Sequence, residues 1–174
     1  MPSPARSVTL ARTVLRLLVW LNLLFAVGAV VTIVASFPFA PVITAQLARK
    51  YRHSVDAPAV LLAMRLLFGF GLVAVVVLHR IFTDLLAILR TVGDGDPFTG
   101  PNADRLGRIG WALLALQLLD LVNAGFTRWF AALHVQYATW SPALSGWIAV
   151  LMCFVLAGVF RHGAAMRDDL ATTV

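Results

Sequence analysis

Hydrophobic residues in this chain form four long runs that are separated by segments richer in Arg, Pro and Gly. The runs extend from Val14 to Phe37, Ala59 to Leu78, Ile109 to Phe126 and Ala143 to Phe160. A helix needs roughly 20 apolar residues to cross the hydrocarbon core of a bilayer. The runs do not alternate between apolar and polar positions, which excludes the strands of a membrane β-barrel. The pattern therefore predicts an all-α, polytopic membrane protein with four transmembrane helices in one domain, residues 1–174.

Apolar residues at helical spacing also occur outside the four runs. Between Val42 and Tyr51 they lie opposite basic residues, which predicts a short amphipathic helix at the outer membrane surface. From Ile81 to Val92 they continue the period of the second run, and Gly93 follows as a typical helix end. We therefore expect the second transmembrane helix to extend into the cytoplasm.

Arg and Lys are distributed unequally between the two sides that four crossings create. Nine lie at the termini and between the second and third runs: Arg6, Arg12, Arg16, Arg80, Arg90, Arg105, Arg108, Arg161 and Arg167. Four lie in the other two connections: Arg49, Lys50, Arg52 and Arg128. Because cytoplasmic loops carry the excess of Arg and Lys, both termini are predicted to be cytoplasmic. A signal peptide cleaved near Ala35-Ser36-Phe37 is the alternative for the first run, which is longer than the apolar core of such peptides.

The composition agrees with a chain whose main solvent is lipid. Hydrophobic residues make up 60% and charged residues 13% of the chain, and the mean hydropathy is +0.87. A net charge of +6 can indicate nucleic-acid binding, but the Arg residues lie at the ends of apolar runs and form no stripe. Direct nucleic-acid binding is therefore not expected. Cys153 is the single cysteine, which excludes an intramolecular disulfide.

The connection between the second and third runs contains a recognisable turn. It reads Gly95-Asp96-Pro97-Phe98-Thr99, with Asn102 and Arg105 following. Pro97 cannot continue the preceding helix, and Thr99 is a predicted N-cap with Asn102 placed to reach back to it. Asp94 and Asp96 resemble the start of a calcium loop, but Arg105 stands where a late carboxylate is needed, so no metal is expected.

The turn and its surroundings also resemble a known family. The matching residues are Gly95 to Thr99, Asn102, Arg105-Leu106, Ile109-Gly110-Trp111, and the tail Met166 to Leu170 with Thr173-Val174. This pattern is similar to the DUF2975 family of bacterial membrane proteins. The resemblance covers nearly the whole chain and implies four spans in the bacterial inner membrane. The resemblance implies no established activity or cofactor. Genes for members of the family often lie beside a gene for a small helix-turn-helix regulator.

Ionisable side chains within the apolar runs are costly in lipid and are therefore candidate functional residues. Arg65 in the second run and Asp120 in the third lie at comparable depths, so the two residues can meet as an intramembrane ion pair. Gln117 and Asn123 share a helix face with Asp120. One interpretation is that this intramembrane polar cluster joins the two helices, and the other is that it forms an ion or proton pathway.

No motif for catalysis is present. The serines lack a nucleophile-elbow context, and His53, His79, His134 and His162 are spread over both predicted membrane boundaries. We therefore predict that the protein is not an enzyme and binds no metal or cofactor. The first functional hypothesis is a membrane-anchored regulatory protein whose turn, Gly95 to Arg105, binds a cytoplasmic partner. The alternative is a small transporter or channel subunit that uses Arg65 and Asp120.

Overall fold

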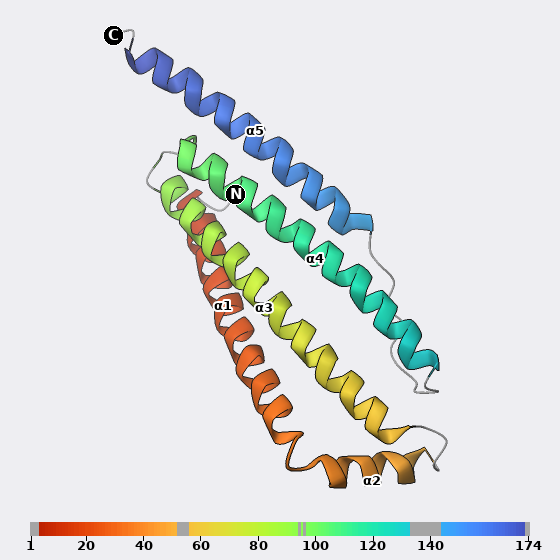
Figure 1. The fold of residues 1–174 in the computed structure, drawn as a ribbon. Helices are drawn as coiled ribbons and strands as arrows, with labels where there is room; N and C mark the ends of the chain where they lie inside the picture. Colours follow the sequence, from red (N-terminus) through yellow and green to blue (C-terminus); the bar gives the residue numbers. More distant parts are fainter. Residues whose placement is uncertain (1–3, 52–55, 94, 96, 133–143, 173–174) are drawn as a thin grey trace. The chain divides into compact units, whose positions relative to one another are not determined.

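The protein is all-α in its computed structural model, which describes residues 4–51, 56–93, 95, 97–132 and 144–172. Five helices follow one another along the described chain (Figure 1): α1 (Pro4–Ala35), α2 (Ala40–Lys50), α3 (Ala57–Gly93), α4 (Gly100–Ala132) and α5 (Leu144–Thr172). Four of them, α1, α3, α4 and α5, are long and apolar enough to cross a membrane. The described chain thus has as many helices able to span a membrane as the hydrophobic pattern predicts.

The shorter predicted features are also present as helices. The predicted amphipathic segment is α2, which has Arg49 and Lys50 in its last turn and no buried residue. The predicted extension of the second span is part of α3, a continuous helix of 37 residues that ends at Gly93. At a rise of 1.5 Å per residue, α3 is about 55 Å long, well over the roughly 30 Å of a hydrocarbon core. A part of α3 must therefore lie outside the bilayer core at any tilt that is usual for a membrane helix.

The described helices contribute to two compact units. Unit 1 comprises residues 1–22, 77–115 and 143–174, and unit 2 comprises residues 23–76 and 116–142. Helices α1, α3 and α4 run through both units, whereas α2 belongs to unit 2 and α5 to unit 1.

Unit 1 is packed through small residues that let large aromatic side chains approach a neighbouring helix. Gly110 of α4 lies so close to Phe154 of α5 that a Cβ atom at this glycine would be 3.1–3.3 Å from the ring. The same ring meets Trp111 edge-on, with 5.4 Å between the centroids. Ala103, Ala157 and Ala164 are buried in this unit. Close approach at small residues is the usual source of helix association in lipid, where apolar surface alone gives no driving force.

Several buried residues of unit 2 lie near the start of α3. Val60, Leu61 and Ala63 are all nearly inaccessible. The rings of Phe70 in α3 and Phe126 in α4 meet edge-on, with 5.0 Å between their centroids. Large apolar side chains elsewhere on the spanning helices are exposed, as expected for surfaces that face hydrocarbon.

Replacing Gly110 by Val should weaken the α4–α5 packing of unit 1. The added side chain has no room beside Phe154, and overpacking of this kind costs about 1–3 kcal/mol. Gly107→Val on the same helix is the matched control, because no atom lies within 4 Å of a Cβ at Gly107. We expect Gly110→Val, and not Gly107→Val, to lower the midpoint of SDS-induced unfolding in mixed micelles, followed by far-UV circular dichroism. Equal midpoints for the two variants would contradict this packing.

Candidate functional site

The connection between α3 and α4 in unit 1 is held together by one buried amide. Asn102 is fully buried. Its Nδ2 atom donates to the carbonyl of Pro97 at 2.9 Å and to Oγ1 of Thr91 at 2.6 Å, and its Oδ1 atom accepts from Nη1 of Arg105 at 2.8 Å. A buried amide left unpaired would cost about 1–3 kcal/mol, so these bonds strongly favour one conformation of the connection. Asn102 thus joins the last turns of α3 to the start of α4.

The capping that we predicted for this turn is only partly correct. The carbonyl of Thr99 accepts from the backbone N–H groups of Asn102 and Ala103, so Thr99 does stand at the N-cap position. Its hydroxyl, however, is buried and has no hydrogen-bond partner among the described residues. Asn102 does not reach back to Thr99, because its amide group is engaged by Pro97 and Thr91 instead. Asp94 and Asp96 lie outside the described residues, and Gly95 takes a left-handed conformation with φ of 85°.

Phe98 projects from this connection toward α5. Its ring lies 4.9 Å from that of Phe160, and a Cβ atom at Gly163 would come within 3.2 Å of it. The absence of a side chain at Gly163 therefore creates the space that Phe98 occupies. Even so, Phe98 remains 46% exposed. It lines a groove of about 720 Å³ along α5, together with Phe154, Val155, Gly158, Val159, His162, Gly163, Met166 and Arg167.

Basic residues surround this end of unit 1, and some of them are paired. Arg108 of α4 forms an ion pair with Asp84 of α3, with 2.8 Å between Nη2 and Oδ1. Arg161 of α5 lies 3.5 Å from Asp104 of α4, and both side chains are largely exposed. Arg12 of α1 donates to the carbonyl of Leu89 near the end of α3. Exposed pairs add little stability, but together these contacts connect all four long helices within unit 1.

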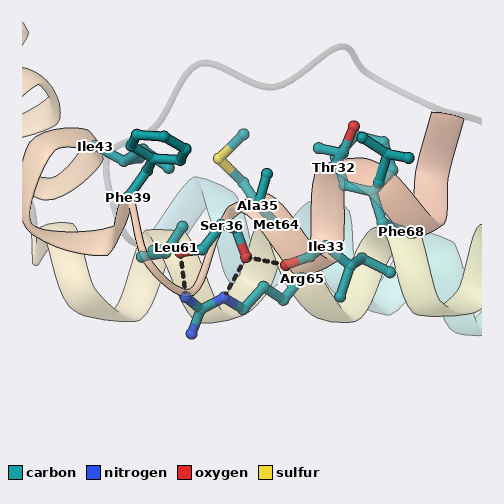
Figure 2. Close-up of a pocket in the computed structure, with 11 residues that line it drawn as sticks. Thr32, Ile33, Ala35, Ser36, Phe39, Ile43, Leu61, Met64, Arg65 and Phe68 are labelled. Atoms are coloured by element: carbon teal, nitrogen blue, oxygen red, sulfur yellow. Dashed lines mark hydrogen bonds between the residues drawn. The ribbon is translucent and has the colours of Figure 1, made fainter.

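In unit 2, Arg65 binds the end of α1. Its Nε atom donates to Oγ of Ser36 at 2.8 Å, and its Nη2 atom donates to the carbonyl of the same residue at 2.6 Å (Figure 2). The guanidinium carbon also lies 4.1 Å from the centroid of the Phe37 ring. Carbonyls at a helix end lack intrahelical partners and carry the negative end of the helix dipole. Arg65 of α3 therefore caps the end of α1 with a positive charge.

The predicted ion pair between Arg65 and Asp120 does not form within the described part of the chain. The ion pairs found there include neither residue. Asp120, Gln117 and Asn123 are partly buried on α4, and Nε2 of Gln117 is buried without a hydrogen-bond partner among the described residues. The nearby helix end offers Arg65 a carbonyl and a hydroxyl on one residue, and this pair of acceptors replaces the carboxylate. Sequence analysis missed Ser36 as a ligand and treated it only as part of a cleavage signal.

The chemistry of both sites is that of binding and positioning. The polar groups of the turn and of the Arg65 site hold backbone atoms in place. Among the described residues, no three His, Cys, Asp or Glu side chains come close enough to share a metal ion. His53 and His134 lie outside the described residues.

The chain is similar to a known protein family over most of its length. The family model described as "Protein of unknown function (DUF2975)" matches residues 16–174, which include both sites. No curated protein and no solved structure matches the chain.

A double-mutant cycle should distinguish the partner of Arg65. We expect Arg65→Gln and Ser36→Ala to be coupled by about 1 kcal/mol, because each removes the same charge-assisted hydrogen bond. Arg65→Gln and Asp120→Asn should be additive to within about 0.5 kcal/mol, as is usual for residues without a shared interaction. The free energies come from SDS-induced unfolding in mixed micelles. Coupling to Asp120 without coupling to Ser36 would restore the predicted ion pair.

Proposed function

The chain belongs to the DUF2975 family, and from this membership and the geometry of unit 1 we propose a multi-pass protein of the bacterial inner membrane that binds a cytoplasmic partner. The binding surface is the turn from Gly95 to Arg105 together with the groove along α5. The protein is not an enzyme in this proposal and needs no cofactor.

The proposed orientation has both termini and the α3–α4 connection in the cytoplasm. Nine of the 14 Arg and Lys residues fall on this side and four on the other, with Arg65 inside a run. Contacts within unit 1 support placing these segments on one side, while the choice of the cytoplasmic side rests on the Arg and Lys count. Arg12 of α1 meets the end of α3, and Phe98 of the turn meets Gly163 of α5. The N-terminal part of α1, the turn and the second half of α5 therefore gather at one end of the unit, as an even number of crossings requires.

The observation that carries the proposal is an exposed aromatic side chain on a rigid turn. Asn102 fixes the turn through three hydrogen bonds, yet Phe98 stays about half exposed beside an apolar groove. A few anchor side chains that fill pockets on the partner contribute most of the binding free energy of a protein interface. Phe98 would serve as such an anchor, because the rigid turn leaves little conformational entropy to lose on binding.

The charge of this end indicates what kind of partner fits. Arg80 and Arg90 are exposed, and the side chains of Arg108 and Arg161 are more than half exposed despite their ion pairs. A matching partner surface is apolar at its centre and acidic at its edge. The proposed partner is a small helix-turn-helix regulator. Since the DNA-binding face of such a protein is basic, it would be repelled here, and docking would use another face.

The alternative function is a small transporter or channel subunit that uses Arg65, Asp120 and Gln117. The unpartnered Nε2 atom of Gln117 is the feature that favours it. A pathway needs polar groups across the whole membrane, and Arg65 is committed to a helix end instead of to Asp120. We therefore rank this function second.

Photo-crosslinking in the membrane tests the proposed function. A photoreactive amino acid replaces Met166, which is exposed and lines the groove beside Phe98. We expect ultraviolet light to link the protein to one soluble protein, identified by mass spectrometry. Phe98→Ala should reduce this capture at least tenfold, and Asn102→Ala should also reduce it by loosening the turn.

The control is Val92→Ala, which shortens an exposed apolar residue at the end of α3 that does not line the groove. It should leave capture unchanged. If Phe98→Ala inserts normally and captures the same protein as strongly as the unmodified turn, the docking surface is wrong. If only lipids and copies of the chain are captured, ion flux through reconstituted Asp120→Asn protein becomes the next test.

A further inference from the structure

Unit 2 contains a second cavity, which lies where α1 ends, α2 begins and α3 passes beneath them. Its volume is about 320 Å³. Figure 2 shows Ala35 of α1, Phe39 just before α2 and Met64 and Phe68 of α3 around it, with Arg65 crossing to Ser36. This size is at the lower end of the range for small-molecule sites, which are mostly apolar with a few polar groups.

The lining of the cavity suits a hydrocarbon chain. Eight of its eleven residues are apolar, and the exceptions are Thr32, Ser36 and Arg65. The hydroxyls of Thr32 and Ser36 donate to the carbonyls of Gly28 and Ile33 within α1. The hydroxyl protons are therefore already used within the helix. Most of the cavity offers only van der Waals contact, and an acyl chain is the apolar group that a bilayer supplies in excess.

Arg65 adds a positive charge that no carboxylate neutralises among the described residues. Its hydrogen bonds go to two uncharged acceptors, the carbonyl and the hydroxyl of Ser36. Nη1 makes no hydrogen bond within the described chain, and in Figure 2 the outer end of the guanidinium projects away from Ser36. A guanidinium in or near hydrocarbon is costly unless an anion or a set of acceptors is present. The remaining N–H groups are suited to the oxygens of a phosphate.

The position of Arg65 along α3 agrees with a ligand at the membrane boundary. It lies eight residues after Ala57, the first residue of α3, which corresponds to about 12 Å along the helix. Side chains on a helix point toward its N-terminus, so the guanidinium lies closer to the boundary than the Arg65 backbone does. The exposed Arg49 and Lys50 end α2 on this side, and Asp56, whose carboxylate accepts from the N–H of Ala59, is the acidic group at the start of α3.

We propose that this cavity binds one anionic phospholipid of the leaflet in which α2 lies. One acyl chain occupies the apolar space between Phe39, Met64 and Phe68, and the phosphate accepts hydrogen bonds from Nη1 of Arg65. Binding then joins α1, α2 and α3 at the end of unit 2. A basic pocket between membrane helices is a known kind of binding site for anionic lipid head groups. The lipid site does not depend on the proposed cytoplasmic partner, which concerns unit 1.

Native mass spectrometry of the full-length protein in detergent tests this site. The probes are phosphatidylglycerol and phosphatidylcholine with identical acyl chains, each titrated separately. We expect phosphatidylglycerol to bind at least fivefold more tightly as a single tightly held lipid. Arg65→Gln should remove this preference, whereas Arg65→Lys should keep part of it because the charge remains. Met64→Trp fills the cavity without touching the charge and should weaken binding of both lipids.

Arg49→Gln is the matched control, because Arg49 is an exposed cation near the same boundary that does not line the cavity. It should leave the preference intact. Circular dichroism separates loss of binding from loss of fold. If Arg65→Gln does not fold, Met64→Trp still tests the cavity, because it leaves Arg65 and Ser36 unchanged. An unchanged preference in Arg65→Gln, or unchanged binding in Met64→Trp, would overturn the proposal. Binding of inorganic phosphate as tightly as phosphatidylglycerol would also overturn it, since the acyl chain would then contribute nothing.

Discussion

Helix ends within or near a membrane impose the constraint on which this structure depends. The last carbonyls of a helix have no intrahelical partner, and lipid supplies no water to replace one. At the end of α1, Arg65 of α3 provides the missing donors to Ser36. Between α3 and α4, Asn102 plays a related part: it donates to the carbonyl of Pro97 in the connection and to the hydroxyl of Thr91 in the last turns of α3. Both contacts connect neighbouring helices at a chain reversal, so satisfying the backbone also determines how the helices pair.

The same contacts determine which surfaces remain available. Because Asn102 fixes the turn from within, Phe98 can project outward without loosening it, and Gly163 leaves the space beside its ring. Because Arg65 uses only uncharged acceptors, it keeps a net positive charge beside an apolar cavity. One site combines a rigid aromatic anchor with a groove and suits a protein partner. The other combines a cation with apolar space and suits a lipid.

Sequence analysis predicted the helices well, because long apolar runs and the 3.6-residue period are local signals. The extension of α3 to Gly93 and the short helix α2 were both readable in this way. It failed where a side chain chooses between distant partners. Arg65 and Asp120 have opposite charge at similar depth, yet Arg65 binds a residue 29 positions earlier in the chain. A serine and a carbonyl at a helix end carry no sequence signal of this role. Asn102 was recognised as important, but its partners depend on the packing of two helices.

Accessibility of single cysteines from the two sides of the membrane tests the central claim, which is a four-span chain with its turn in the cytoplasm. Cys153 is replaced by Ser, and a cysteine is introduced in place of either Lys50 in α2 or Arg90 in α3, both exposed. In intact spheroplasts, a membrane-impermeant maleimide should label the cysteine at position 50 and not the one at position 90. In inside-out vesicles the pattern should reverse. Labelling of both positions from the same side would contradict a crossing by α3 and, with it, the four-span arrangement.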